Sequence, residues 1–362
     1  MNYIVPEYYK NFSCKCGECR HSCCDGWPIR ISMKEYYRLL GDGCSPKLRT
    51  RLDCALKLSS SPSFNTYTYA QIATDWQGIC MLHQPDGLCA LQSELGEANL
   101  PEVCRLYPRH AKHRDGGSEC SCSNSCEAVV DMLMQMHEPM QFEAIELSIH
   151  PLFESDHGSY GYDNITEAIA ILQNRSLSLT QRFININHFL HGNELDTRGL
   201  DSLALLLQII PSLLIHYIDS NSISDYCIAS QEYFYLNGSQ FLSSEMQDTV
   251  TERYQTASAS LELLLPNWQI LFEQLIVNHM FYNHFFLTDN RKKIQDDFLS
   301  LTMMYSFLRF NLMGNLTTIT TSDKLVDYLA SMFRVIEHSN FHSVAVKLYQ
   351  SIFPFDSNIS VY

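Results

Sequence analysis

The pattern of apolar positions divides the chain into a long helical part and a shorter, irregular part. From about residue 150 onward, apolar residues recur at spacings of three and four, which is typical of helices with one buried face. The helices that this spacing predicts are 164–174, 178–191, 200–219, 223–236, 243–264, 267–287, 292–312, 322–338 and 340–351. Hydroxyl and amide side chains stand near the predicted starts and are candidate N-caps. They are Asn164, Ser178, Ser224 and Ser322.

The first 140 residues contain shorter periodic segments. Ser32 and Glu35 have the spacing of a capping box, so a helix is expected at about 33–40. Pro46 is expected to open a second helix that runs to about residue 58. The remaining helices expected in this part are 88–95 and 126–137.

Alternating apolar and polar positions are scarce, so few strands are expected. We therefore predict a mainly α fold. In this fold a loop-rich, cysteine-dense N-terminal domain, residues 1–140, packs on an all-helical C-terminal domain, residues 141–362.

Charge and cysteine are distributed in opposite ways along the 362 residues. Residues 1–130 are neutral, whereas residues 131–362 hold the whole net charge of −15. Thirteen of the fourteen cysteines lie in residues 14–126. The absence of a basic stripe argues against nucleic acid. The acidic half is suited to a lysine-bearing partner, and a solubilising surface is the simpler interpretation.

The length and position of the apolar segments predict the compartment of the protein and whether it enters a membrane. The N-terminus shows no basic region followed by an apolar run, so no secretory signal is expected. The most apolar segment, 203–218, is short for a bilayer and contains Gln208, Pro211 and His216. We expect a cytoplasmic protein without membrane insertion, in which a disulfide framework is disfavoured. The oligomeric state is left open.

The densest chemical signal is the stretch from Phe12 to Trp27, FSCKCGECRHSCCDGW, which holds five cysteines. Three more segments add cysteines at GICMLH, DGLCALQSELGE and LPEVCRLYPRH, and ECSCSNSCE follows. So many soft ligands favour a four-thiolate zinc site or a [4Fe-4S] cluster. Spacing alone leaves zinc, iron and a purely structural centre open. The eight cysteines taken as metal ligands are Cys14, Cys19, Cys23, Cys24, Cys80, Cys89, Cys104 and Cys126.

Other polar residues near these cysteines are weaker candidates. The nearby histidines, for each of which an ordinary role is the simpler interpretation, are His21, His83, His110 and His113. A basic run is suited to a carboxylate or a phosphate and equally to a solvated face. It consists of Arg105, Arg109, Lys112 and Arg114. The phosphate-loop, nucleophile-elbow, zincin and Rossmann glycine motifs are all missing from the sequence.

These motifs together resemble the flagellin lysine-N-methylase family, the FliB family. The first motif is similar to F-x-C-x4-C-x3-C-C-x-G-W. The second resembles a frame of G-L-C, L-G-E and C-R-x-Y-P-R, and includes Cys80. Ser125-Cys126-Glu127-Ala128 lacks the proline of the third motif, and Asn278 to Phe286 is similar to an aromatic-rich element of the family. The cysteine pattern is also similar to a broader group of zinc- or iron-chelating proteins.

The resemblance implies a protein-lysine N-methyltransferase. It would transfer a methyl group from S-adenosylmethionine to flagellin lysines and would carry a [4Fe-4S] cluster, with zinc as the alternative. A non-enzymatic metal-binding adaptor that docks flagellin is the alternative function. No catalytic base or donor pocket is assigned. Tyr107, Asn278 and Tyr282 are candidates by composition, although core packing explains each of them.

Overall fold

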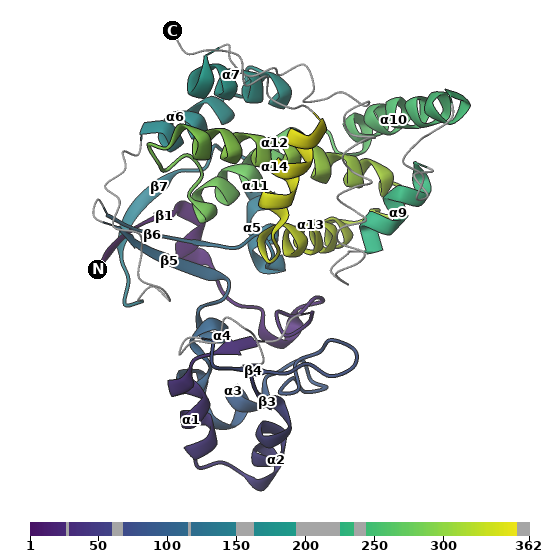
Figure 1. Cartoon of the computed structure of the whole chain (residues 1–362). Coiled ribbons are helices and arrows are strands. Elements are labelled where there is room, and N and C mark those ends of the chain that lie inside the picture. The colour runs from purple at the N-terminus through teal and green to yellow at the C-terminus, as the bar shows by residue number, and fades with distance from the viewer. Residues whose placement is uncertain are drawn as a thin grey trace.

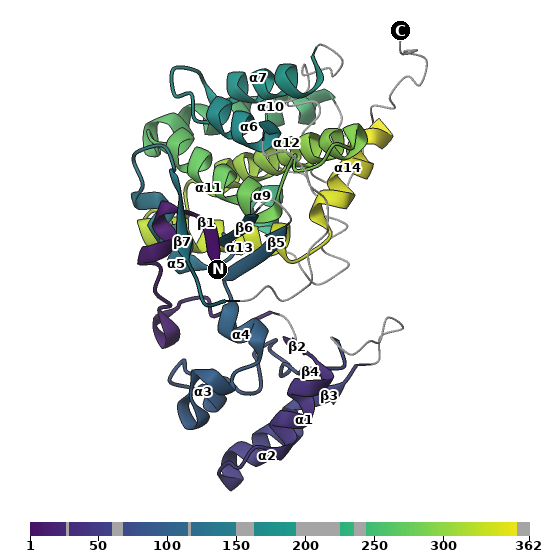
Figure 2. The same cartoon turned by 90° about the vertical axis from the view of Figure 1, so that its left-hand side faces the viewer.

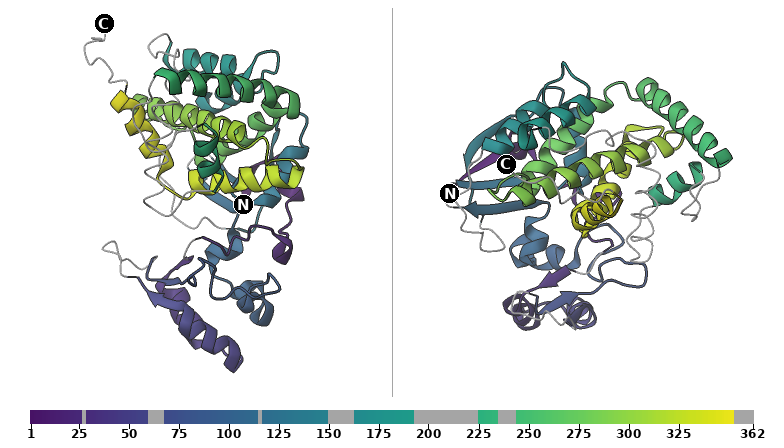
Figure 3. Two further views of the ribbon diagram at one scale, coloured as in Figure 1. Left: turned by 90° about the vertical axis from the view of Figure 1, so that its right-hand side faces the viewer. Right: turned by 45° about the horizontal axis from the view of Figure 1, so that its top comes forward.

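The computed structural model describes residues 1–26, 29–59, 68–114, 117–149, 163–192, 225–234 and 244–352. Within these ranges the protein consists of a large helical body with a sheet at one side and a smaller unit below it (Figures 1 and 2). The two views in Figure 3 show the same separation. None of the helices in the described ranges is long and apolar enough to cross a bilayer.

A four-stranded sheet joins the two ends of the cysteine-rich part. Its strands are β1 (Asn2–Pro6), β5 (Arg109–Arg114), β6 (Gly117–Cys122) and β7 (Phe142–Glu146). Their order is β5-β6-β1-β7, with β1 parallel to β6 and antiparallel to β7. The prediction of an all-helical part after residue 141 was wrong at β7, because five residues are too few to establish an alternating pattern.

The helical body supplies most of the buried surface. Its helices are α5 (Glu127–Gln135), α6 (Asp163–Leu172), α7 (Leu179–His191), α9 (Asp225–Tyr233), α10 (Ser244–Leu264), α11 (Trp268–Asn283), α12 (Arg291–Gly314), α13 (Ser322–Glu337) and α14 (Phe341–Ile352). Most residues from Phe272 to Phe281 of α11 are buried, so this helix lies inside the body. It contacts α5, α6, α12 and β6.

The predicted helices of this part are confirmed wherever the structure describes them. The Ser178 hydroxyl accepts from the Gln181 amide and caps α7 as expected. The predicted cap of α13 was wrong by one residue, since Thr321 and not Ser322 accepts from the Lys324 amide. Helix 200–219 and Ser224 lie outside the described residues.

The smaller unit is built from short elements around a separate core. It contains β2 (Ile29–Ile31), β3 (Leu56–Leu58), β4 (Ala70–Ile72), α1 (Met33–Gly41), α2 (Pro46–Ala55), α3 (Ala90–Leu95) and α4 (Glu102–Leu106). The Ser32–Glu35 capping box is present at the start of α1. The second predicted helix ends early, at Ala55, because Leu56–Leu58 pairs with β4 as a strand.

Short 3-10 segments connect these elements. They are η1 (Glu7–Asn11), η2 (Cys16–Glu18) and η3 (Glu97–Asn99). One hydrophobic core extends from Tyr3 of β1 through α5 to Ala345 of α14, and the other holds residues between Ile31 and Leu100. The division into residues 1–140 and 141–362 stays a prediction about folding units.

Candidate functional site: a cysteine-lined cavity

A cavity of about 430 Å³ lies where the smaller unit meets the helical body. Its lining comes from the loop after η1, the turns around β4 and α3, α4, the start of α5 and Arg334 of α13. All eight cysteines taken as metal ligands line it, and so does Cys16, which the family pattern had left out. Folding therefore gathers thiols that are up to 112 positions apart in the sequence, from Cys14 to Cys126.

The thiols interact as two groups within this cavity. The first group is Cys24 and the three thiols that interact with it, which are Cys80, Cys89 and Cys104. The second group is Cys14, Cys19 and Cys126. The Cys23 thiol lies between them, because it interacts with Cys24 and Cys104 on one side and with Cys14 on the other. Its largest interaction is the hydrogen bond with Cys24, so Cys23 links the two groups, and counting it with the second gives four thiols in each.

The thiols of the first group differ strongly in acidity. Hydrogen bonds from the Cys23 and Cys80 thiols hold the pKa of Cys24 well below its usual range. The hydrogen bond between Cys80 and Cys24 raises the pKa of Cys80. Burial raises the pKa of Cys104. Cys24 is therefore the first of these thiols to become a thiolate, the form that binds metals.

A buried carboxylate holds the first cysteine loop in place. Glu127 is the first residue of α5, and its side chain is fully buried. One of its oxygens accepts from the backbone amides of Arg20 and His21, both at 3.0 Å, and the other accepts from Lys15 Nζ at 3.3 Å. A carboxylate at a helix N-terminus is also stabilised by the helix dipole. The loop between Cys14 and Cys23 is thus tied to the helix that begins beside Cys126.

Helix α13 holds the same loop from the other side. The Arg334 guanidinium donates to the carbonyl oxygens of His21 at 2.6 Å and Ser22 at 3.1 Å. Arg20 Nε donates to Asp327 Oδ1 at 2.7 Å. Together with Glu127, these contacts fix the loop between two helices of the body.

Two glycines permit the close approach of the loop to the Asp86–Gly87 turn. A Cβ at Gly17 would lie 2.8 Å from the Asp86 carbonyl oxygen, and a Cβ at Gly87 would lie 2.7 Å from the Gly17 carbonyl oxygen. Gly87 also has φ +80°, a conformation that favours glycine. A side chain at either position would push apart the loop of Cys14–Cys19 and the turn that precedes Cys89.

The weaker candidates are scattered by the fold. Arg105 and Arg109 line the cavity, whereas Lys112 and Arg114 lie along β5. Arg109 also packs over the Phe12 ring at 4.7 Å.

Of the four candidate histidines, two are near the cysteines. His21 lines the cavity, and His83 lies close enough to Cys24 to affect its ionisation. The two others lie on β5, where burial lowers the pKa of His110 to about 3 and His113 bonds Ser118 at 2.6 Å.

The side chains that line the cavity can be compared with the ligands that a zinc ion or an iron–sulfur cluster requires. Among the residues that the structure describes, no three His, Cys, Asp or Glu side chains converge as ligands of a single metal ion. A cluster places its four thiolates on separate iron atoms, whereas a zinc ion needs four sulfurs about 2.3 Å from one point. Eight predicted ligands line one cavity, and their thiols fit cluster chemistry in ligand type.

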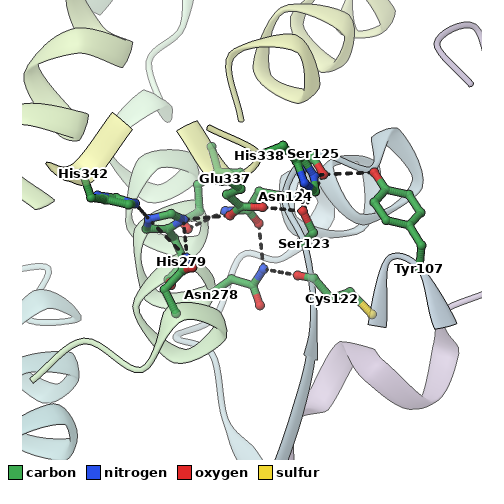
Figure 4. A network of polar contacts seen from close by, with 12 residues as sticks. Tyr107, Cys122, Ser123, Asn124, Ser125, Asn278, His279, Glu337, His338 and His342 are labelled. Atoms are coloured by element: carbon green, nitrogen blue, oxygen red, sulfur yellow. Dashed lines mark hydrogen bonds and ion pairs between the residues drawn. The ribbon is translucent and has the colours of Figure 1, made fainter. Parts of the chain in front are cut away.

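Next to the cavity lies a buried polar network that the sequence did not predict (Figure 4). His279 Nδ1 and Glu337 Oε1 are 2.7 Å apart, and both side chains are fully buried. The second Glu337 oxygen accepts from the Ser123 hydroxyl. Burial raises the pKa of Glu337 to about 7, and burial lowers the pKa of His279 to about 3. A carboxyl group that titrates near neutrality is suited to proton transfer.

All three candidates chosen by composition belong to this network, and Tyr282 joins it through a hydrogen bond with Ser123. The Tyr107 hydroxyl lies 2.9 Å from Ser125 Oγ, and Tyr107 also lines the cavity. The Asn278 amide donates to the Cys122 carbonyl at 2.8 Å and to Asn124 at 2.7 Å. Asn278 therefore holds the turn after β6, which is a structural role. The missed residue His279 lies in the same aromatic-rich element as Asn278, which was the one sequence signal for it.

The fold and the cavity together define a largely helical protein with two small sheets and a thiol-lined site at the junction of two cores. Residues 193–345 match a protein-family model described as the FliB lysine N-methylase C-terminal domain. The resemblance noted in the sequence is thereby confirmed over these residues, and the family's name denotes a lysine methylase. No curated protein and no solved structure matches the chain.

Proposed function

We propose that the protein is a lysine N-methyltransferase that uses S-adenosylmethionine to methylate flagellin. The observation that carries the proposal is the match of residues 193–345 to the FliB lysine N-methylase C-terminal domain. The cysteine-lined cavity supports it, because its volume of about 430 Å³ lies within the usual range of small-molecule sites. The family name also supports flagellin as the protein substrate, and the acidic surplus of residues 131–362 is suited to lysine-bearing segments.

The first cysteine group would hold a [4Fe-4S] cluster. Its ligands would be Cys24 and the three thiols that interact with it on the cavity wall, Cys80, Cys89 and Cys104. A bound cluster would supply iron at the wall of this cavity. The second group, Cys14, Cys19, Cys23 and Cys126, provides four further thiols for another centre.

Methyl transfer itself requires a neutral lysine amine. Its nitrogen attacks the methyl carbon of the sulfonium, the carbon–sulfur bond breaks, and S-adenosylhomocysteine leaves. At pH 7 about one free lysine in 10³ is neutral. The site must therefore remove a proton before the transfer.

The test combines metal analysis with methyl transfer on anaerobically purified protein. We expect about four irons and four sulfides for one occupied cysteine group, about eight of each for two, and labelled methyl groups on flagellin lysines. Cys24→Ser should lose the iron of the first group and the transfer. Cys54→Ser is the matched control, because Cys54 is exposed on α2 and lies outside the cavity.

Each contrary outcome has a distinct meaning. Iron without methyl transfer in the wild-type protein would leave a metal-binding adaptor for flagellin. Zinc in place of iron, with transfer intact, would reduce the thiols to a structural centre. Equal loss in Cys24→Ser and Cys54→Ser would show that the cavity is not the site.

A further inference from the structure

A continuous series of hydrogen bonds runs from the cavity wall into the helical body. It begins at Tyr107, whose hydroxyl bonds Ser125 at 2.9 Å, and Ser125 bonds Ser123. Ser123 then bonds Glu337, which in turn bonds His279 at 2.7 Å. Figure 4 shows these side chains pointing toward one another, with Tyr107 from the end of α4, the serines from the turn after β6, Glu337 from α13 and His279 from α11.

Each group between the cavity and Glu337 can both donate and accept a hydrogen bond. A hydroxyl has one proton and two lone pairs, so a proton that enters at one oxygen can leave at the next without movement of heavy atoms. Such a series passes protons along as each bond reverses direction. No residue between Tyr107 and Glu337 interrupts it.

The series also has a branch toward solvent. Ser125 Oγ lies 2.8 Å from His338 Nε2, and His338 is exposed at the end of α13. Ser125 therefore connects three places: the cavity through Tyr107, the buried carboxyl through Ser123, and the surface through His338.

We propose that Glu337 is the proton acceptor of the methyl-transfer site and that Tyr107, Ser125 and Ser123 carry the substrate's proton to it. The inference rests on the proposed function. The lysine ammonium gives a proton to the Tyr107 oxygen, and the Tyr107, Ser125 and Ser123 hydroxyl protons each move one bond along. The carboxylate becomes a carboxylic acid, and the lysine becomes a neutral amine. The proton then returns through Ser123 and Ser125 to His338 and water.

The surroundings of Glu337 suit this role. It faces His279 and Tyr282 of α11, Tyr8 of η1 and His338 on its own helix. Burial raises its pKa from 4.5 to about 7. Against a free lysine with a pKa of about 10.4, this reduces the mismatch from about six units to about three. Desolvation of the lysine in the cavity would narrow it further.

His279 holds the carboxyl in place from the other side. Its Nε2 lies 3.1 Å from His342 Nε2, and the Asn283 amide lies 3.1 Å from its Nδ1. These contacts fix the imidazole that bonds Glu337 Oε1. His279 is a positioning residue, because it reaches the cavity only through Glu337.

The test is the pH profile of methyl transfer between pH 6 and pH 10. Glu337→Gln keeps the shape of the side chain but cannot take up a proton. We expect its kcat to fall by about 100-fold at pH 7 and to recover toward pH 10, where lysine loses its proton to solvent. KM should change little. Ser125→Ala should show the same profile, and Glu337→Asp should partly restore the rate at pH 7.

Tyr328→Phe is the matched control for Tyr107→Phe. Tyr328 lies on α13 and donates from a buried hydroxyl to the Leu308 carbonyl at 2.6 Å, away from the series. Its variant should keep the wild-type profile, whereas Tyr107→Phe should resemble Glu337→Gln. A Glu337→Gln profile parallel to wild type at every pH would overturn the inference alone. Wild-type protein that transfers no methyl group would overturn the proposed function and this inference with it.

Discussion

At the residue scale, one carboxylate organises the first cysteine loop. Glu127 follows Cys126 directly, so the residue that anchors the loop is fixed to a residue of the second thiol group. Its two oxygens accept three hydrogen bonds from residues 15–21, and its side chain is fully buried. A buried carboxylate in this position stabilises the loop only while all its donors remain in place.

We expect Glu127→Gln to loosen this loop. The glutamine amide keeps the size of the side chain but loses the charge. One carboxylate oxygen is replaced by an NH2 group, which then faces N–H donors of the loop and cannot accept from them. Charge-assisted bonds of this kind contribute about 1.5–3 kcal/mol each, so a loss of about 3 kcal/mol in the free energy of unfolding is expected. Urea unfolding at pH 7 measures it.

Asp131→Asn is the comparison for Glu127→Gln. Asp131 also pairs with Lys15, but both of these side chains are 28% exposed. Exposed pairs contribute about 0–1 kcal/mol. A similar loss in both variants would show that burial of Glu127 is not what stabilises the loop.

At the element scale, α13 links the cavity to the buried network. Arg334 holds the cysteine loop, and Glu337 lies one turn further along the helix. The cap at the start of α13 therefore stabilises the helix that carries both Arg334 and Glu337. The sequence offered two adjacent hydroxyls there, and the structure assigns the cap to Thr321, whose Oγ1 accepts from the Lys324 amide at 3.2 Å.

Separate substitution of Thr321 and Ser322 shows which of the two hydroxyls caps α13. Thr321→Ala leaves a helix amide without its partner, and we expect a loss of about 1 kcal/mol in the free energy of unfolding. Ser322→Ala removes a hydroxyl from the first helical position and should change it by less than about 0.5 kcal/mol. Thermal unfolding of both variants in one buffer measures the difference. The reverse order of the two losses would place the cap at Ser322.

At the scale of the whole molecule, buried histidines make stability depend on pH. The folded-state pKa values of His110 and His279 are lowered to about 3, and that of His342 is lowered strongly, in each case mainly by burial. Below pH 6.5 the unfolded chain binds protons that the folded chain excludes, so stability falls as pH drops from 6.5. Glu337 acts in the opposite direction between pH 7 and 4.5, because its folded-state pKa is raised.

We expect the stability lost through these three histidines to exceed the stability gained through Glu337. The melting temperature should therefore fall steadily from pH 7 to pH 5. His342→Gln should reduce the slope, because glutamine takes up no proton in the unfolded state. His137→Gln is the control, since His137 is exposed on the segment after α5. Differential scanning calorimetry at several pH values provides the measurement. An unchanged slope in His342→Gln would contradict the assignment.

Also at this scale, the thiol-lined cavity depends on both cores. The cysteines of the first group come mainly from the smaller unit, whereas Glu127 and Arg334 come from the helical body. The family match at residues 193–345 includes Arg334 of the helical body but not Glu127. The smaller unit supplies the thiols of the first group, and the helical body supplies Cys126 and the side chains that hold the first cysteine loop.

The sequence by itself determined the helices of the second half that the structure describes, the capping box at Ser32 and eight of the nine cysteines that line the cavity. These are local signals: periodicity, cap spacing and cysteine motifs can be recognised without knowledge of neighbours in space. The tertiary structure alone decided the short strands, because β5 is polar and β6 is buried along nearly its whole length. It also decided the division of the thiols into two groups and the series from Tyr107 to Glu337. These features join residues up to 230 positions apart, and only packing brings their side chains within hydrogen-bonding distance.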